Sequence, residues 1–153
     1  MEDSDLLIRP AEGRDAPALA ELMGELGYPI TLEDMRDRLN FVASSAADAL
    51  LVADSGGRVV GLIGVQVSDF VHRVARYGRI TALVVAAGYR RRGVAAALLK
   101  HTEAFLAARG IADVHVDAGS HRKEEAHRFY EAQGYAATGV RFTKKLKAGN
   151  EGG

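Results

Sequence analysis

Hydrophobic residues recur at three- and four-residue spacing in several long stretches of the chain, which is the pattern of a helix with one apolar face. The first stretch has Pro17 in its first turn and Gly27 directly after its last apolar residue, as helix starts and ends favour. Thr31 precedes the second stretch at the position of a capping residue. The pattern predicts helices over about 15–26, 32–42, 94–106 and 124–133.

Elsewhere the apolar residues alternate or form short runs, which is typical of strands. A turn from Asp54 to Gly57 joins two of these runs into a hairpin. The runs predict strands over about 6–8, 49–53, 59–67, 78–85, 114–116 and 141–146. The predicted helix over about 94–106 connects two of the strands, and such a crossover makes them parallel neighbours. The sequence therefore predicts an α+β fold of the α/β sandwich type, with a mixed central β-sheet flanked by helices.

Length and composition fit one folded domain. The chain has 153 residues, of which 48% are hydrophobic and 26% are charged. We expect the domain to span residues 1–147 and to be followed by a flexible tail over residues 148–153. The chain contains no cysteine, which excludes a disulfide scaffold, a cysteine-bound metal and a thiol nucleophile.

Charge and hydropathy argue against two large classes of partner. Twenty basic residues balance 20 acidic ones, so no overall field favours nucleic acid. The first residues are acidic, and no apolar run approaches the roughly 18 residues of a membrane span. We therefore expect a cytoplasmic protein that binds neither nucleic acid nor a membrane.

The segment from Arg90 to Ala95 carries the clearest chemistry. Three consecutive arginines and Gly93 stand between a predicted strand and a predicted helix. Unpaired backbone N–H groups at a helix start favour an anion, and the small residues Gly93 and Ala95 would let a diphosphate approach the backbone. A solvated basic turn is the alternative interpretation of the same residues. The segment lacks the glycine patterns of a P-loop or a dinucleotide-binding loop, which argues against kinases and dehydrogenases.

Two motifs stand at a fixed spacing in the second half of the chain. The first is Arg90-x-x-Gly93-x-Ala95 after Leu83-Val84-Val85, and the second is Ala126-His-Arg-Phe-Tyr130 followed by Gly134-Tyr135. Together they resemble the GCN5-related N-acetyltransferase (GNAT) superfamily, over a range from about Leu6 to Leu146. A narrower part, from Arg122 to Tyr135 with the ending Arg141 to Lys144, is similar to aminoalkylphosphonate N-acetyltransferases.

The resemblance implies that two splayed parallel strands form a cleft for acetyl-CoA, the co-substrate. Backbone groups of Leu83, Val84 and Val85 would face its pantetheine. Its pyrophosphate would be held by Arg90, Arg91, Arg92, Gly93, Val94 and Ala95. Tyr130 stands where the family has a tyrosine directed at the sulfur, and a phenol with a pKa of about 10 can donate a proton to a departing thiolate. The other interpretation of Tyr130 is a core aromatic of its helix.

The proton acceptor for the amine does not follow from the motifs. Many family members have a glutamate just before the Leu-Val-Val segment, where this chain has Thr81 and Ala82. Asp117, near the end of the strand after the crossover, and His121, in the next loop, are the nearest candidates by topology, and a water molecule can relay the proton.

Other polar residues offer alternatives to these two. Asp69 and His72, before the strand over about 78–85, are further candidates for the base. His115 shares a strand face with Asp117, but two such residues make a poor metal site, so we predict a structural pairing and no metal site.

These features predict an enzyme that transfers an acetyl group from acetyl-CoA to a primary amine of a small molecule, by direct attack in a ternary complex. Arg73, Arg76 and Arg79 favour an acceptor with an anionic group. Two alternatives stay open: an N-acetyltransferase that acts on peptides or proteins, and a CoA-binding regulatory module without transfer activity. The dimers that are frequent in the resembled family leave a homodimer open as well.

Overall fold

A mixed β-sheet forms the centre of the computed structural model, which describes residues 6–117, 123–139 and 141–146. The expected tail over residues 148–153 lies outside this part of the chain. The strands of the sheet are β1 (Leu6–Pro10), β2 (Asp48–Ser55), β3 (Arg58–Asp69), β4 (Arg76–Val85) and β5 (Asp113–Val116), in that spatial order. Neighbours are antiparallel except for β4 and β5, which are parallel. The predicted α+β class and the parallel pair are therefore confirmed.

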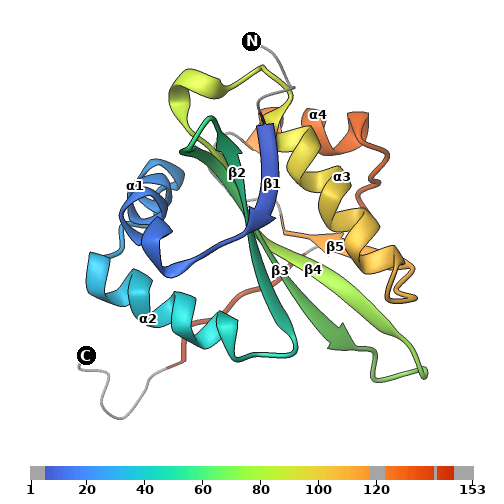
Figure 1. Cartoon of the computed structure of the whole chain (residues 1–153). Helices are drawn as coiled ribbons and strands as arrows, with labels where there is room; N and C mark the ends of the chain where they lie inside the picture. The colour runs from blue at the N-terminus through green and yellow to red at the C-terminus, as the bar shows by residue number, and fades with distance from the viewer. Residues whose placement is uncertain (1–5, 118–122, 140, 147–153) are drawn as a thin grey trace.

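Helices cover both faces of the sheet (Figure 1). Helices α1 (Ala16–Leu26) and α2 (Leu32–Ala43) lie on one face, and α3 (Val94–Ala107) and α4 (Lys123–Ala132) lie on the other. The predicted end signals act as expected. Gly27 ends α1 with a φ of 103°, and the Thr31 hydroxyl accepts a 3.0 Å hydrogen bond from the Asp34 N–H at the start of α2.

The alternation of side chains along β4 divides the core in two. Val84 packs with the residues under α1 and α2, whereas Leu83 and Val85 pack with those under α3. Each core holds fully buried leucines, such as Leu19 of α1 and Leu98 of α3. The end of β4 is therefore held firmly from both sides, which fixes the position of the loop that follows it.

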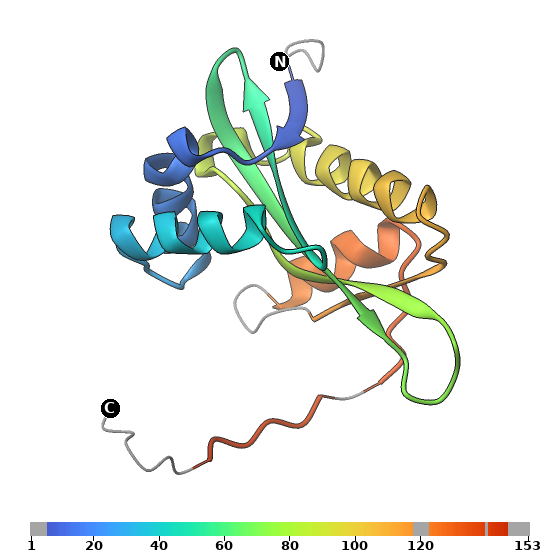
Figure 2. The ribbon, with the colours of Figure 1, turned by 60° about the horizontal axis from the view of Figure 1, so that its bottom comes forward.

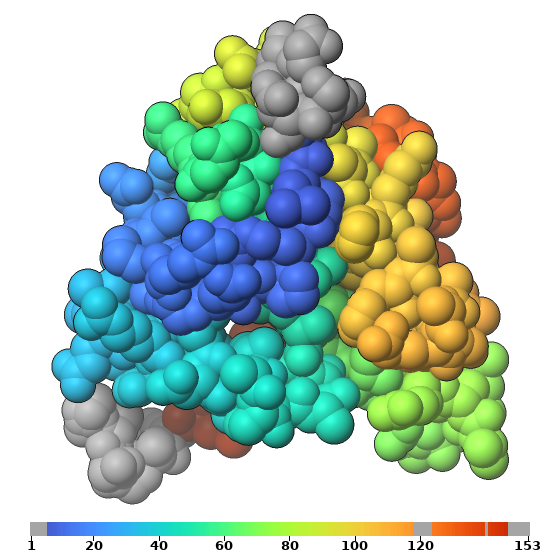
Figure 3. Space-filling model, viewed as in Figure 1, coloured from blue at the N-terminus to red at the C-terminus, as the bar shows by residue number. Residues whose placement is uncertain are grey.

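The far end of the β3–β4 hairpin projects from the body below α3 (Figure 3). Two valines at its tip, Val71 and Val74, are fully exposed. The helices of the described segments are all too short or too polar to span a bilayer.

The predicted strand over residues 141–146 is wrong. This segment is extended but unpaired and runs away from the sheet (Figure 2), with Phe142 92% and Leu146 79% exposed. An alternating pattern becomes a strand only where a neighbour supplies its hydrogen bonds, and none of the described strands pairs with this segment.

Candidate active site

Strands β4 and β5 separate halfway along β4. Their parallel pairing runs from Tyr77 to Ile80 on β4, and its last pair is Ile80 with Val116. At this point a bulge against β3 makes Thr81 an extra residue in β4. From Thr81 to Val85, β4 keeps β3 on one side but has no described partner on the other. The predicted backbone contacts at Leu83 to Val85 therefore lie on an open strand edge, while their side chains belong to the core.

The loop after this open edge presents the start of α3. Arg91 and Gly93 both have left-handed backbones, with φ of 65° and 79°, and Arg91 is the one non-glycine residue of the described chain with a positive φ. For a non-glycine residue such as Arg91 this conformation costs about 1–3 kcal/mol, and such residues cluster at binding sites. Gly93 is the N-cap of α3 and has no side chain to cap it. The first N–H groups of α3 are therefore free to bind an anion.

Arg90 and Arg92 of this loop lie in different places, and Arg58 of β3 lies close to Arg92's partner Tyr89. Arg90 turns back, where its Nε donates a 3.3 Å hydrogen bond to the carbonyl of Val85. The guanidinium of Arg92 lies 5.1 Å from the centre of the Tyr89 ring, and that of Arg58 from β3 lies 5.6 Å from the same centre. Two cations therefore lie beside Tyr89, which ends the short turn before the start of α3.

The space in front of Gly93 tests whether this loop can take a diphosphate. A Cβ placed on Gly93 would meet no atom within 4 Å, so the helix start faces open space. Free N–H groups, exposed Arg91 and Arg92, and this open approach together fit the pyrophosphate of CoA.

Tyr130 lies on the α3 side of the same region. Its ring packs edge-on against Phe129 and Tyr135, with ring centres 5.1 Å and 5.7 Å away. It packs against the same core cluster as Leu83 of β4 and Ala95 of α3. Burial raises the pKa of Tyr130 to about 12, because the phenolate would lose its hydration.

Asp117 lies at the opposite face of the sheet. Val114 and Val116 point toward α3, so the alternation directs His115 to the other face, where its ring stacks on Tyr77 at 4.6 Å. Asp117 follows β5 directly, and its Oδ2 accepts a 2.7 Å hydrogen bond from Arg79 and lies 3.8 Å from Arg141. The predicted pairing of His115 with Asp117 is therefore wrong, because His115 stacks on Tyr77 and Asp117 bonds with Arg79.

The remaining candidates for the base fall elsewhere. His121 lies outside the described residues, so its role stays a prediction. Asp69 and His72 lie at the projecting hairpin. Asp69 of β3 pairs with Arg76, which stands five residues before Thr81 on β4, roughly 16 Å along the strand. They are too remote to reach the open edge.

The row of arginines expected to favour an anionic acceptor is already paired. Each forms an ion pair with an aspartate: Arg73 with Asp113 at 2.9 Å, Arg76 with Asp69 at 3.4 Å, and Arg79 with Asp117 at 2.7 Å. The positive charge of this row is largely neutralised within the chain, which weakens the case for an anionic acceptor. Among the described residues, no three histidine or acidic side chains gather as metal ligands would.

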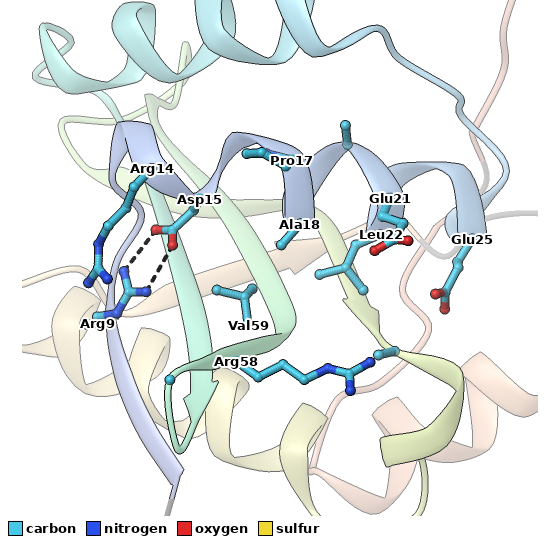
Figure 4. A pocket seen from close by; sticks show the side chains of 13 residues that line it. Arg9, Arg14, Asp15, Pro17, Ala18, Glu21, Leu22, Glu25, Arg58 and Val59 are labelled. Carbon is cyan, nitrogen blue, oxygen red and sulfur yellow. Dashed lines mark hydrogen bonds and ion pairs between the residues drawn. The ribbon is translucent and has the colours of Figure 1, made fainter.

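Two features of the site carry no signal in the sequence. The extra residue Thr81 depends on the register of the neighbouring strand β3. Glu25 in the last turn of α1 accepts a 3.0 Å hydrogen bond from the N–H of Ala87, which is 62 residues away in the chain. Glu25 also borders a hollow of about 750 Å³ between α1 and the β2–β3 turn, shown in Figure 4.

Comparison with known proteins agrees with this geometry. Residues 16–135 match the model of a family described as the acetyltransferase (GNAT) family. Among solved structures, a GNAT family acetyltransferase from Staphylococcus aureus is 26% identical, with a TM-score of 0.79 over 93% of this chain and 99% of the other. No curated protein matches the sequence.

Two more distant structures share the fold. Glucosamine-6-phosphate N-acetyltransferase from Arabidopsis thaliana is 20% identical, with a TM-score of 0.79 over 93% of this chain and 99% of the other. An aminoglycoside N-acetyltransferase in complex with CoA is 15% identical, with a TM-score of 0.82 over 94% of this chain and 95% of the other.

Proposed function

The chain belongs to the GNAT family of acetyltransferases, and on that premise we propose that it transfers the acetyl group of acetyl-CoA to a primary amine of a small molecule. One observation carries the proposal. Leu83 on the open edge of β4, Ala95 in the first turn of α3 and Tyr130 of α4 all pack against one core cluster. We expect this reaction to take place in the cytoplasm.

Two parts of acetyl-CoA, the pyrophosphate and the pantetheine, have matching groups in the chain. The N–H groups at the start of α3, with Arg91 and Arg92, would bind the pyrophosphate, and the open backbone from Thr81 to Val85 would bind the pantetheine. When bound, acetyl-CoA supplies an activated acetyl thioester. The chain has no cysteine to carry the acetyl group itself, which favours direct attack by the amine.

The reaction needs a proton donor and a proton acceptor, and we assign these roles to residues on opposite faces of the sheet. A carbon–nitrogen bond forms as the carbon–sulfur bond breaks, the ammonium loses two protons, and the thiolate takes up one. Tyr130 is protonated at neutral pH, as an ordinary phenol is, and burial raises its pKa further to about 12, so its hydroxyl can donate to the departing sulfur. Asp117, directly or through water, would accept a proton from an acceptor amine that approaches on the opposite face.

A small-molecule acceptor is the first choice for testing. The two distant structural relatives named above are an aminoglycoside N-acetyltransferase and a glucosamine-6-phosphate N-acetyltransferase. The polar face beside β5 carries both signs of charge, in Arg79, Asp113 and Asp117. It therefore suits an acceptor with mixed polar groups better than a strongly charged one.

The test measures release of the CoA thiol from acetyl-CoA with a panel of amino sugars, aminoglycosides, aminoalkylphosphonates, polyamines, amino acids and short peptides. A thiol reagent sees only the product, because the chain has no cysteine. Turnover with one class of small amine supports the proposal. Preference for peptides would favour the protein-directed alternative, and binding of acetyl-CoA without any turnover would favour a regulatory module.

A pair of variants tests the role of Tyr130. Tyr130→Phe removes the phenol hydroxyl, and we expect kcat to fall by about 100-fold while acetyl-CoA affinity stays nearly constant. Tyr135→Phe is the matched control, because its hydroxyl instead donates a 2.7 Å hydrogen bond to Glu103 of α3. Unchanged turnover in Tyr130→Phe would remove this residue from the role of acid.

A further inference from the structure

Glu25 ties the end of α1 to the loop that follows β4. Its Oε1 accepts the 3.0 Å hydrogen bond from the N–H of Ala87 and lies 3.8 Å from Nη2 of Arg90. The side chains of Glu25 and Arg90 are each about one third exposed, at 35% and 31%. One carboxylate therefore reaches both the first turn of the loop and its first arginine.

The contact fixes the path of the chain as it leaves β4. The N–H of Ala86 donates a 2.8 Å hydrogen bond to the carbonyl of Val60 on β3, and the next N–H, that of Ala87, donates to Glu25. Two consecutive amides are thus held by two different elements. Ala87 begins the 3-10 turn Ala87–Tyr89, so its N–H has no acceptor inside the turn and depends on Glu25.

Arg90 is held by the same arrangement. Its Nε bonds to the carbonyl of Val85, and its Nη2 faces Glu25, so both sides of its guanidinium contact the chain's own groups. The left-handed residue Arg91 follows directly. The strained part of the loop therefore starts from a fixed point.

We propose that Glu25 is a positioning residue for the loop over residues 86–93, and that it holds Ala87 and Arg90 in place before CoA binds. The inference rests on the proposed function. A loop that is already ordered loses less freedom on binding, and this raises affinity for the pyrophosphate. The negative charge of Glu25 by itself would lower the affinity for an anion, so the direction of the measured change separates positioning from electrostatics.

The same helix offers a matched control. Glu21 stands one turn before Glu25 on α1 and lines the same hollow (Figure 4). It has no hydrogen bond or ion pair within the described part of the chain. Glu21→Ala removes the same charge from the same helix without touching the loop.

The experiment compares Glu25→Ala, Glu25→Gln and Glu21→Ala with the wild-type chain. The dissociation constant of CoA is measured by calorimetry, and amide exchange of Ala87 is measured by NMR in the absence of ligand. In Glu25→Ala we expect the Ala87 amide to exchange about tenfold faster and the CoA dissociation constant to rise about fivefold. Glu25→Gln keeps an amide oxygen that can accept the Ala87 hydrogen bond, so it should restore most of the protection, and Glu21→Ala should change neither value.

Kinetics and binding separate the possible failures. With an active acceptor, Glu25→Ala should raise KM for acetyl-CoA and leave kcat nearly unchanged. Unchanged or tighter CoA binding in Glu25→Ala, or an unchanged Ala87 exchange rate, would overturn the positioning role and leave the proposed function intact. A wild-type chain that does not bind CoA would overturn the proposed function and the positioning role together.

Discussion

Removal of Asp15 tests how the first helix is anchored to the sheet. Asp15 is only 4% exposed and precedes α1 directly. Its carboxylate accepts hydrogen bonds of 2.8 Å and 2.9 Å from Arg9 of β1 and a 2.7 Å bond from the N–H of Glu12. Arg9 also donates a 3.1 Å bond to Asp54 of β2. The cluster joins two strands to the start of α1 in a place where water is largely excluded.

The size of the effect follows from burial. Removing one partner of a buried ion pair costs about 3–5 kcal/mol, because the other charge stays buried without compensation. In Asp15→Ala, Arg9 would keep Asp54, so we expect a loss of about 3 kcal/mol, at the lower end of that range. Arg14→Gln is the control: it breaks the exposed pair of Arg14 with Glu12, which should cost less than about 1 kcal/mol.

The effect should also depend on pH. Burial alone would raise the pKa of Asp15, but the hydrogen bonds from Arg9 and the Glu12 N–H outweigh it and hold the pKa below its usual 3.8. The stability that the ionised group contributes is therefore present above pH 3.8, and it is lost as pH falls through the lower pKa of the folded state. The difference between wild type and Asp15→Ala should be full at pH 7 and should shrink in strong acid.

Urea unfolding followed by far-ultraviolet circular dichroism measures these differences, provided that the slope m is the same for each variant. If Asp15→Ala at pH 7 costs no more than Arg14→Gln, the buried cluster does not anchor α1 and the reasoning fails. Acetyl transfer by folded Asp15→Ala should be retained, because the cluster does not border the open edge of β4.

Four further changes have definite expected outcomes. Gly78→Ala would place a Cβ 2.5 Å from the buried Leu106 Cδ1, and overpacking should cost about 1–3 kcal/mol in urea unfolding. Phe142→Ser, at a side chain 92% exposed, should change stability by less than about 0.5 kcal/mol. Gly93→Ala should weaken CoA binding in calorimetry, because φ is 79° and the new methyl enters the open approach. Burial raises the pKa of Tyr130 above its usual 10.0 to about 12. Its stabilising contribution is therefore present below pH 10 and is lost as pH rises to about 12. In Tyr130→Phe the free energy of unfolding should fall less steeply over that pH range.

Most of the fold could be predicted from local patterns in the sequence. The helices follow from apolar spacing and from their end residues, as at Gly27 and Thr31, because these signals act within a few residues of the chain. The parallel pair of β4 and β5 follows from connectivity alone. The segment over residues 141–146 shows the limit: its alternation is local, but the hydrogen bonds of a strand come from a distant partner, and the pattern cannot supply one.

Some features of the candidate site could likewise be predicted from the sequence, and others could not. The Arg90 to Ala95 segment could be predicted as an anion site, because a helix start and its charges are contiguous in sequence. The left-handed backbone at Arg91 could not, since nothing in an arginine side chain indicates a positive φ. The contact of Glu25 with Ala87 joins positions 62 residues apart, so only the packing of α1 against the sheet reveals it.

The bulge at Thr81 lies beside the position where many family members have a glutamate and this chain has none. Ala82, which stands near the position of that glutamate in many family members, packs into the core under α1 and α2 and carries no ionisable group. The extra residue Thr81 marks the point where β4 separates from β5, and Asp117 follows β5 at that level on the face opposite α3. A carboxylate, which is ion-paired with Arg79, thus stands after the neighbouring strand at the level where β4 itself has none. If Asp117 accepts the proton of the amine, Asp117→Asn should lower kcat at neutral pH, and the loss should diminish as rising pH deprotonates the acceptor amine without help.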